Sequence, residues 1–130
     1  MNNKYISIAA YIGALTVAIG AFGAHALKEN LNADAMAIFD TAVKYQFYHV
    51  FALLAAGILY NSKPNKMIKV SGQLFIAGIV LFCGSLYALT FIKSSGNNSL
   101  NWLGAITPFG GLCFIAGWVC MAISIPSKSP

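Results

Sequence analysis

The sequence contains no arginine and few charged residues of any kind. Only 8% of its 130 residues are charged, whereas 58% are hydrophobic. A soluble domain carries about 25% charged residues, so this chain cannot cover a soluble globule with polar surface. The bilayer must therefore be its solvent. Without arginine, bidentate recognition of phosphate or carboxylate by a guanidinium group is also excluded.

Acidic residues are rarer than lysines, three against eight, which leaves a net charge of +5. The lysines stand singly in the polar connecting segments and form no basic face interleaved with stacking aromatics. A nucleic-acid partner is therefore excluded, and we interpret the positive charge as a signal of membrane topology.

The three cysteines, Cys83, Cys113 and Cys120, lie at irregular spacing inside apolar runs. They match neither a disulfide framework nor a CxxC motif, so we interpret them as small packing residues. No paired carboxylates and no nucleophile motif occur, and we predict no catalytic residues. An enzyme that uses Asp40, His49 and Tyr45 for acid–base chemistry is the third and least supported alternative.

Four apolar segments predict an all-α integral membrane four-helix bundle that forms one domain over residues 1–130. The spans cover about residues 5–27, 41–60, 70–92 and 102–125. The first is about 34 Å long as a helix, enough to cross the hydrocarbon layer. It resembles a secretory signal, with Lys4 and an Ala24-His25-Ala26 triplet, but its apolar run exceeds the ~7–15 residues of a signal core. We therefore interpret it as a retained transmembrane helix.

The segments between the spans contain two further predicted features. Asn32 is a suitable N-cap for a short interfacial helix over 33–39. This helix is either separate from the second span or continuous with it. Neither Gly nor Pro occurs in 33–56 to interrupt a continuous helix. Inside the fourth span, Pro108 followed by Gly110 and Gly111 predicts a kink or a locally opened turn.

Lysines are distributed unequally between the two sides of this topology. One side carries five lysines and no acid, and the other carries three lysines with all three acids. By the positive-inside rule, both termini and the loop over 63–69 are cytoplasmic. The lysine-rich side holds Lys4, Lys63, Lys66, Lys69 and Lys128.

Most polar side chains of the spans fall in the opposite, outer half of the bilayer. Polar groups in hydrocarbon are costly unless paired, and ionisable ones face the bundle interior or a wetted cavity. We therefore predict an outward-facing polar cavity or hydrogen-bond network. Its candidate residues are His25, Tyr45, Gln46, His49, Ser85, Tyr87 and Thr107.

Small residues in the spans predict close helix packing, because they let neighbouring backbones approach. The candidates for helix packing are Gly13, Gly20, Gly23, Ala24, Gly84, Pro108, Gly110 and Gly111.

Two histidines on adjacent spans raise the question of a metal or haem. His25 and His49 differ in depth by about 8 Å, and no third ligand has a motif spacing, so we predict neither a metal nor any other cofactor. His25 is either a ligand or proton-exchanging group, or a residue that caps a helix C-terminus. His49 is either a functional intramembrane group or a buried structural residue.

Several motifs in order along the chain resemble the YgdD/YwdK family of small bacterial inner-membrane proteins, a family of unknown function with relatives in eukaryotes. One departure is Cys83, where glycine is usual. The resemblance implies a four-helix protein of the bacterial inner membrane and brings no established reaction. The motifs are Gly20 through Leu27, Phe39 through His49, Gly84 through Tyr87, Leu103 through Gly111, and Gly117-Trp118.

We therefore expect a non-enzymatic membrane protein that acts through helix packing. Its partners would be membrane lipids and either further copies of itself or other membrane proteins. The alternative is a small transporter or channel for protons or a small solute, using the outer polar cluster and the broken fourth span.

Overall fold

The computed structural model describes residues 3–96 and 102–126, all in helices or short connections, with no strand among them. Four helices are long and apolar enough to cross a membrane, which confirms the predicted all-α fold with four spans. The shortest has 22 residues and is about 33 Å long. The helical segments are α1 (Lys4–Phe22) with η1 (Gly23–Leu27), α2 (Ala33–Ser62), α3 (Lys66–Gly78) with η2 (Ile79–Cys83) and α4 (Gly84–Ser94), and α5 (Leu103–Ser124).

Helix α2 begins after the N-cap residue that the sequence predicts. The Asn32 side chain accepts a hydrogen bond from the Ala35 amide at 2.8 Å, which confirms it as the N-cap. A separate interfacial helix is not present, because residues 33–39 form the first two turns of α2. Nothing in this stretch breaks the helix, so the continuous alternative is correct. Lys128 and residues 97–101, between the third and fourth predicted spans, lie outside the described residues.

Of the kink or locally opened turn predicted at Pro108, the opened turn is wrong, since α5 is helical throughout with Pro108 inside it. Pro108 is the sixth residue of α5, so the bond it cannot donate belongs to the second turn, near the helix start. The π-helical deviations lie elsewhere, at Gly23–Leu27 and Ile79–Cys83. Neither was predicted, because a π-bulge has no strong sequence signature.

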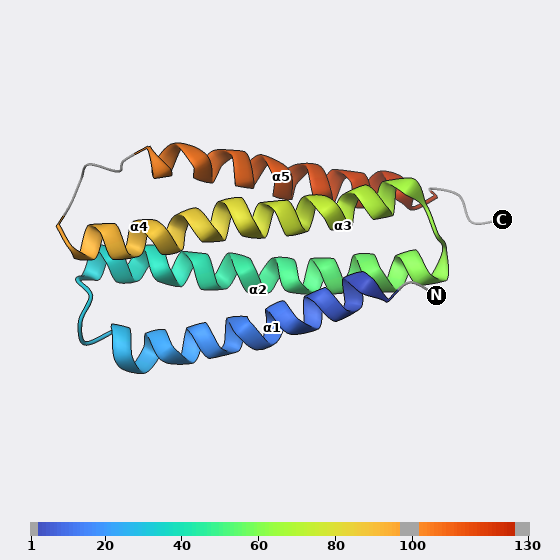
Figure 1. Cartoon of the computed structure of the whole chain (residues 1–130). Helices are drawn as coiled ribbons and strands as arrows, with labels where there is room; N and C mark the ends of the chain where they lie inside the picture. The colour runs from blue at the N-terminus through green and yellow to red at the C-terminus, as the bar shows by residue number, and fades with distance from the viewer. Residues whose placement is uncertain (1–2, 97–101, 127–130) are drawn as a thin grey trace.

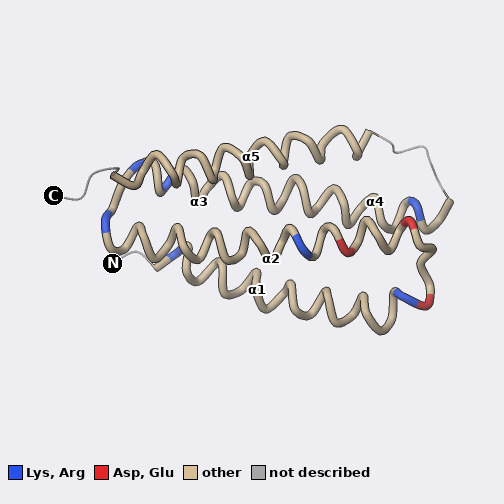
Figure 2. Tube along the Cα trace, turned by 180° about the vertical axis from the view of Figure 1, so that it is seen from behind, with Lys and Arg blue, Asp and Glu red and all other residues tan. Residues whose placement is uncertain are grey.

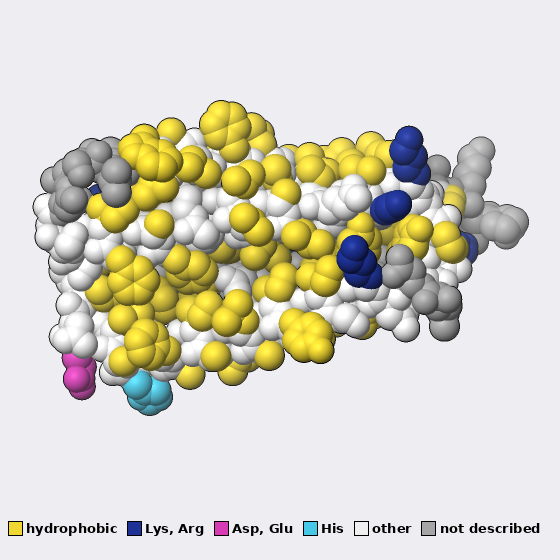
Figure 3. Space-filling model, in the orientation of Figure 1, with side chains coloured by type: hydrophobic (Ala, Val, Ile, Leu, Met, Phe, Trp, Pro, Cys, Tyr) yellow, Lys and Arg dark blue, Asp and Glu magenta, His cyan; other side chains and the backbone are white. Residues whose placement is uncertain are grey.

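The four long helices lie roughly antiparallel, with α2 between α1 and the α3–α4 helix, and α5 packed along α3 (Figure 1). In its most apolar window, 44% of α2 is buried, compared with 17% of the first span. Both described ends of the chain and the α2–α3 turn share one end of the molecule, here called the terminal end (Figure 1). The face shown in Figure 3 is largely hydrophobic between the two ends, and large hydrophobic side chains are exposed on all four spans.

Helices α3 and α5 interlock through glycines that accept aromatic rings from the opposite helix. A Cβ atom on Gly117 would lie 2.7 Å from the Phe75 ring, and a Cβ on Gly78 would overlap the Phe114 ring. The Ser71 hydroxyl also donates a hydrogen bond to the Gly117 carbonyl at 2.8 Å. Small residues thus bring these backbones close enough for direct side-chain to backbone bonding.

Some of the residues predicted to pack helices contact a neighbouring helix, and others do not. Gly110 touches the Phe82 backbone and Gly23 touches the Phe39 ring, while Gly13 and Gly20 each make an ordinary contact with a valine. Gly84 was a wrong choice, because a Cβ there would meet nothing within 4 Å. Gly111 has only distant contact with Phe82, and Ala24 and Pro108 are exposed.

Replacing Gly110→Ala should destabilise the bundle, because the new Cβ would lie 2.7 Å from the Phe82 Cα and the backbones must separate. We expect a loss of about 1–3 kcal/mol in the free energy of unfolding. Gly84→Ala is the matched control, since its Cβ enters open space. Unfolding followed by circular dichroism in detergent measures both; equal effects of the two substitutions would show that the Gly110 contact does not limit packing.

Candidate functional site

A hydrogen-bonded chain of polar side chains crosses the interior and joins three helices. The Tyr87 hydroxyl of α4 donates to Gln46 Oε1 at 2.7 Å, and Gln46 Nε2 donates to the Thr16 hydroxyl of α1 at 2.6 Å. Thr16 in turn donates to the Ile12 carbonyl at 2.6 Å. Gln46 is 3% exposed and Thr16 is fully buried. The three hydroxyl and amide donors in this chain each bond an acceptor inside the bundle.

His49 lies one turn further along α2 and joins α5 to the interior. Its Nδ1 lies 2.7 Å from the Tyr45 carbonyl, which can only accept, so Nδ1 carries the proton. Its Nε2 accepts a hydrogen bond from Trp118 Nε1 at 3.2 Å. The Phe114 ring stacks on the imidazole with 3.5 Å between centroids. Both nitrogens are therefore engaged, and the contacts fit the neutral imidazole.

A third polar contact joins α4 to α5. Ser85 Oγ lies 2.6 Å from Thr107 Oγ1 and also donates to the Phe82 carbonyl at 2.9 Å. Since serine has one hydroxyl proton, Thr107 is the donor to Ser85 in this arrangement. The contact holds the start of α5 against the third span, close to Pro108.

The structure thus brings six of the seven candidate residues near one another and separates the seventh. Gln46 and Tyr87 are bonded, as are Ser85 and Thr107, and Tyr45 packs on Phe82 with ring centroids 4.7 Å apart. His25 is exposed at the end of the first span and does not join this network. A histidine in the last turn of a helix is suited to the negative end of the helix dipole.

Sequence reasoning missed two residues of the network, Thr16 and Trp118. Thr16 stands in an almost entirely apolar run of the first span, and an isolated hydroxyl in such a run is itself a signal of interhelical bonding. Trp118 lacks a comparable signal, because an interfacial role and an interior role for tryptophan give the same sequence pattern.

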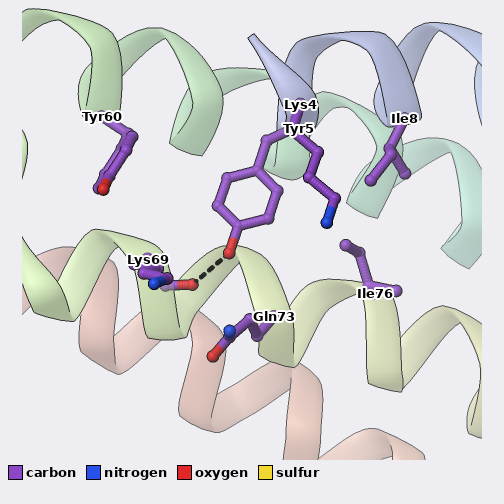
Figure 4. Close-up of a pocket in the computed structure, with 7 residues that line it drawn as sticks. All are labelled: Lys4, Tyr5, Ile8, Tyr60, Lys69, Gln73 and Ile76. Carbon is purple, nitrogen blue, oxygen red and sulfur yellow. Dashed lines mark hydrogen bonds between the residues drawn. The ribbon is translucent and has the colours of Figure 1, made fainter. Parts of the chain in front are cut away.

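A cavity of about 290 Å³ lies at the terminal end, away from this network. Its polar lining comes from α1, α2 and α3 and was not predicted. Lys4, Tyr5, Tyr60, Lys69 and Gln73 form the polar lining, and Ile8 and Ile76 form the apolar part (Figure 4). Among the described residues, no group of three or more His, Cys, Asp or Glu side chains is arranged to hold a metal.

Comparison with known proteins identifies relatives along nearly the whole chain. Residues 19–111 match the family model described as "Protein of unknown function (DUF423)". A UPF0382 membrane protein of Haemophilus influenzae is 43% identical over 99% of both chains. The UPF0382 membrane protein YwdK of Bacillus subtilis is 35% identical, covering 92% of this chain and 94% of its own. The UPF0382 inner membrane protein YgdD of Escherichia coli is 34% identical, covering 95% and 90%.

These matches confirm the resemblance to the YgdD/YwdK family. No solved structure matches this chain. These relatives are named as membrane proteins, which agrees with the four apolar helices of the structure.

Replacing Gln46→Leu should destabilise the fold, because Tyr87 loses its buried acceptor and Thr16 loses its donor. We expect a loss of about 1–2 kcal/mol, in line with interhelical hydrogen bonds in membrane proteins. Combining it with Tyr87→Phe in a double-mutant cycle should give a coupling of about 0.6 kcal/mol.

Unfolding by steric trapping in detergent or lipid measures this coupling, and Thr41→Val is the control. Thr41 is exposed, and its hydroxyl bonds only the Ala37 carbonyl of its own helix. A coupling of zero between positions 46 and 87 would contradict an energetic role for the network.

Proposed function

The chain belongs to the DUF423 family of membrane proteins of unknown function, and from this premise we propose that it is a non-enzymatic protein that acts by helix packing. Its partners are further copies of itself or other membrane proteins. The observation that carries the proposal is the exposed small-residue face of α1. Ala10, Ala14 and Ala18 are four residues apart and all exposed, whereas α1 packs on α2 through the opposite side, with Ala9 and Thr16 buried.

Small residues at this spacing favour association of helices in lipid. Lipid is as apolar as leucine, so helices associate through close van der Waals contact and not through a hydrophobic driving force. A face made of alanines lets a second backbone approach. The bulkier exposed residues on either side, such as Tyr11 and Val17, would border such a contact.

The interior polar residues support packing over the transport alternative. A transporter or channel needs a wetted path through the bilayer. Gln46 and His49 are 3% and 5% exposed and are bonded to other side chains of the bundle. Such contacts use up the groups that would otherwise bind water or a solute.

We also propose that the terminal end is cytoplasmic and that the membrane is the bacterial inner membrane. The described lysines at this end are Lys4, Lys63, Lys66 and Lys69, and all three acidic residues lie in the other half of the molecule (Figure 2). An excess of lysine in short cytoplasmic segments is the usual determinant of orientation.

Cysteine labelling in intact cells tests the orientation. Lys63→Cys lies in the α2–α3 connection and Glu29→Cys in the α1–α2 connection, and both positions are exposed. An impermeant maleimide should label the Glu29→Cys variant in intact cells. It should label the Lys63→Cys variant only after the membrane is opened. The unsubstituted protein reports labelling of its own cysteines, and the reverse pattern would invert the orientation.

Substituting Ala14→Ile tests the packing face, because an isoleucine there holds a neighbouring helix away. We expect self-association in liposomes, measured by energy transfer between labelled copies, to weaken about tenfold, the equivalent of about 1.4 kcal/mol. Leu15→Ile is the control, since Leu15 is 55% exposed on the same helix but off this face. Wild-type copies that remain monomeric at every protein-to-lipid ratio would contradict the homo-oligomer and leave the accessory role.

A further inference from the structure

The cavity at the terminal end has the chemistry of a lipid site. It lies where three spans meet the membrane boundary: Lys4 is the first residue of its span, Lys69 is in the first turn of α3, and Tyr60 is near the end of α2. Tyrosine and lysine are both typical of the zone where lipid head groups lie. We therefore expect Lys4, Tyr60 and Lys69 at head-group depth.

The wall of the cavity is held by a hydrogen bond that does not involve the Lys69 side chain. Tyr5 donates a hydrogen bond to the main-chain carbonyl of Lys69 at 2.8 Å (Figure 4). The Tyr5 ring is seated on Gly72, where a Cβ would lie 2.6 Å away. Because the bond goes to the backbone, substituting the Lys69 side chain keeps the wall in place.

Positive charge gathers around this cavity without an acidic residue in its lining. Lys4 and Lys69 line it, and Lys66 lines a neighbouring open hollow that shares Tyr60, Lys69 and Gln73 with it. Lysine side chains are grouped on this face near the terminal end (Figure 3). Basic pockets between spans at the cytoplasmic side attract anionic lipid head groups.

The lining becomes apolar toward the middle of the bilayer. Ile8 lies one turn deeper than Lys4, and Ile76 lies seven residues, or about 10 Å, beyond Lys69. Figure 4 shows Lys4 and Tyr5 extending from α1 toward α3, with Ile8 and Ile76 beside them. A polar, positive mouth that continues into an apolar groove matches a molecule with an anionic head and a hydrocarbon tail.

We propose that this cavity binds an anionic phospholipid, with its phosphodiester head group at Lys4 and Lys69 and an acyl chain along Ile8 and Ile76. The phosphate chemistry alone would also fit free inorganic phosphate. A free anion, however, would use only the lysine half of the site and would leave the isoleucine half without a role. The site is independent of the packing face on α1, so either proposal can fail without the other.

The test uses the full chain in phosphatidylcholine bilayers that contain a trace of spin-labelled phosphatidylglycerol or of spin-labelled phosphatidylcholine with the same acyl chains. The fraction of immobilised lipid gives the relative association constant. We expect phosphatidylglycerol to be preferred and Lys4→Gln with Lys69→Gln to reduce its association about 30-fold, with Lys69→Gln alone giving about 5-fold. Phosphatidylcholine association should not change.

A matched control removes the same charge elsewhere. Lys63→Gln with Lys93→Gln takes away two lysines that line neither cavity, so phosphatidylglycerol association should change less than about twofold, the weak effect of a screened surface charge. Equal losses in the two double variants, or equal association of the two lipids with the wild type, would overturn the site. Displacement of the labelled phosphatidylglycerol by inorganic phosphate would identify a soluble anion as the ligand and overturn the lipid.

Discussion

Gln46 and His49 of α2 must find hydrogen-bond partners inside the protein, because lipid offers none. They lie three residues apart on one face of α2, and between them they contact the other three spans: Thr16 of α1, Tyr87 of α4 and Trp118 of α5. Each bond fixes the height and rotation of one neighbouring helix against α2. The position of α2 at the centre of the fold follows from this requirement.

Close packing of apolar side chains also holds the helices together. The α3–α5 pair interlocks by placing Phe75 and Phe114 on glycines of the opposite helix. Phe114 also stacks on His49, so the apolar interlock and the polar centre share a residue. A change in the α3–α5 spacing would therefore move the imidazole as well, and the two kinds of contact are coupled.

The terminal end of the molecule differs from the middle of its interior. The middle of the interior is closed by hydrogen bonds and aromatic rings, whereas the terminal end carries lysines around an open cavity. Both hollows lined by Tyr60, Lys69 and Gln73 lie at this end. The polar contacts of Gln46 and His49 thus lie apart from the lysines that line this cavity.

The sequence by itself determined the number of spans, the N-cap at Asn32 and the family, because long apolar runs, capping residues and ordered motifs are local signals. It also indicated Gln46, Tyr87, Ser85 and Thr107 as interior polar groups, since such groups are costly in lipid wherever they occur. Only the tertiary structure decided which of them meet, that Thr16 and Trp118 join them, that His25 does not, and that Lys4 and Lys69 line one cavity. These outcomes depend on the rotation and height of each helix, which are set by contacts between residues far apart in the chain.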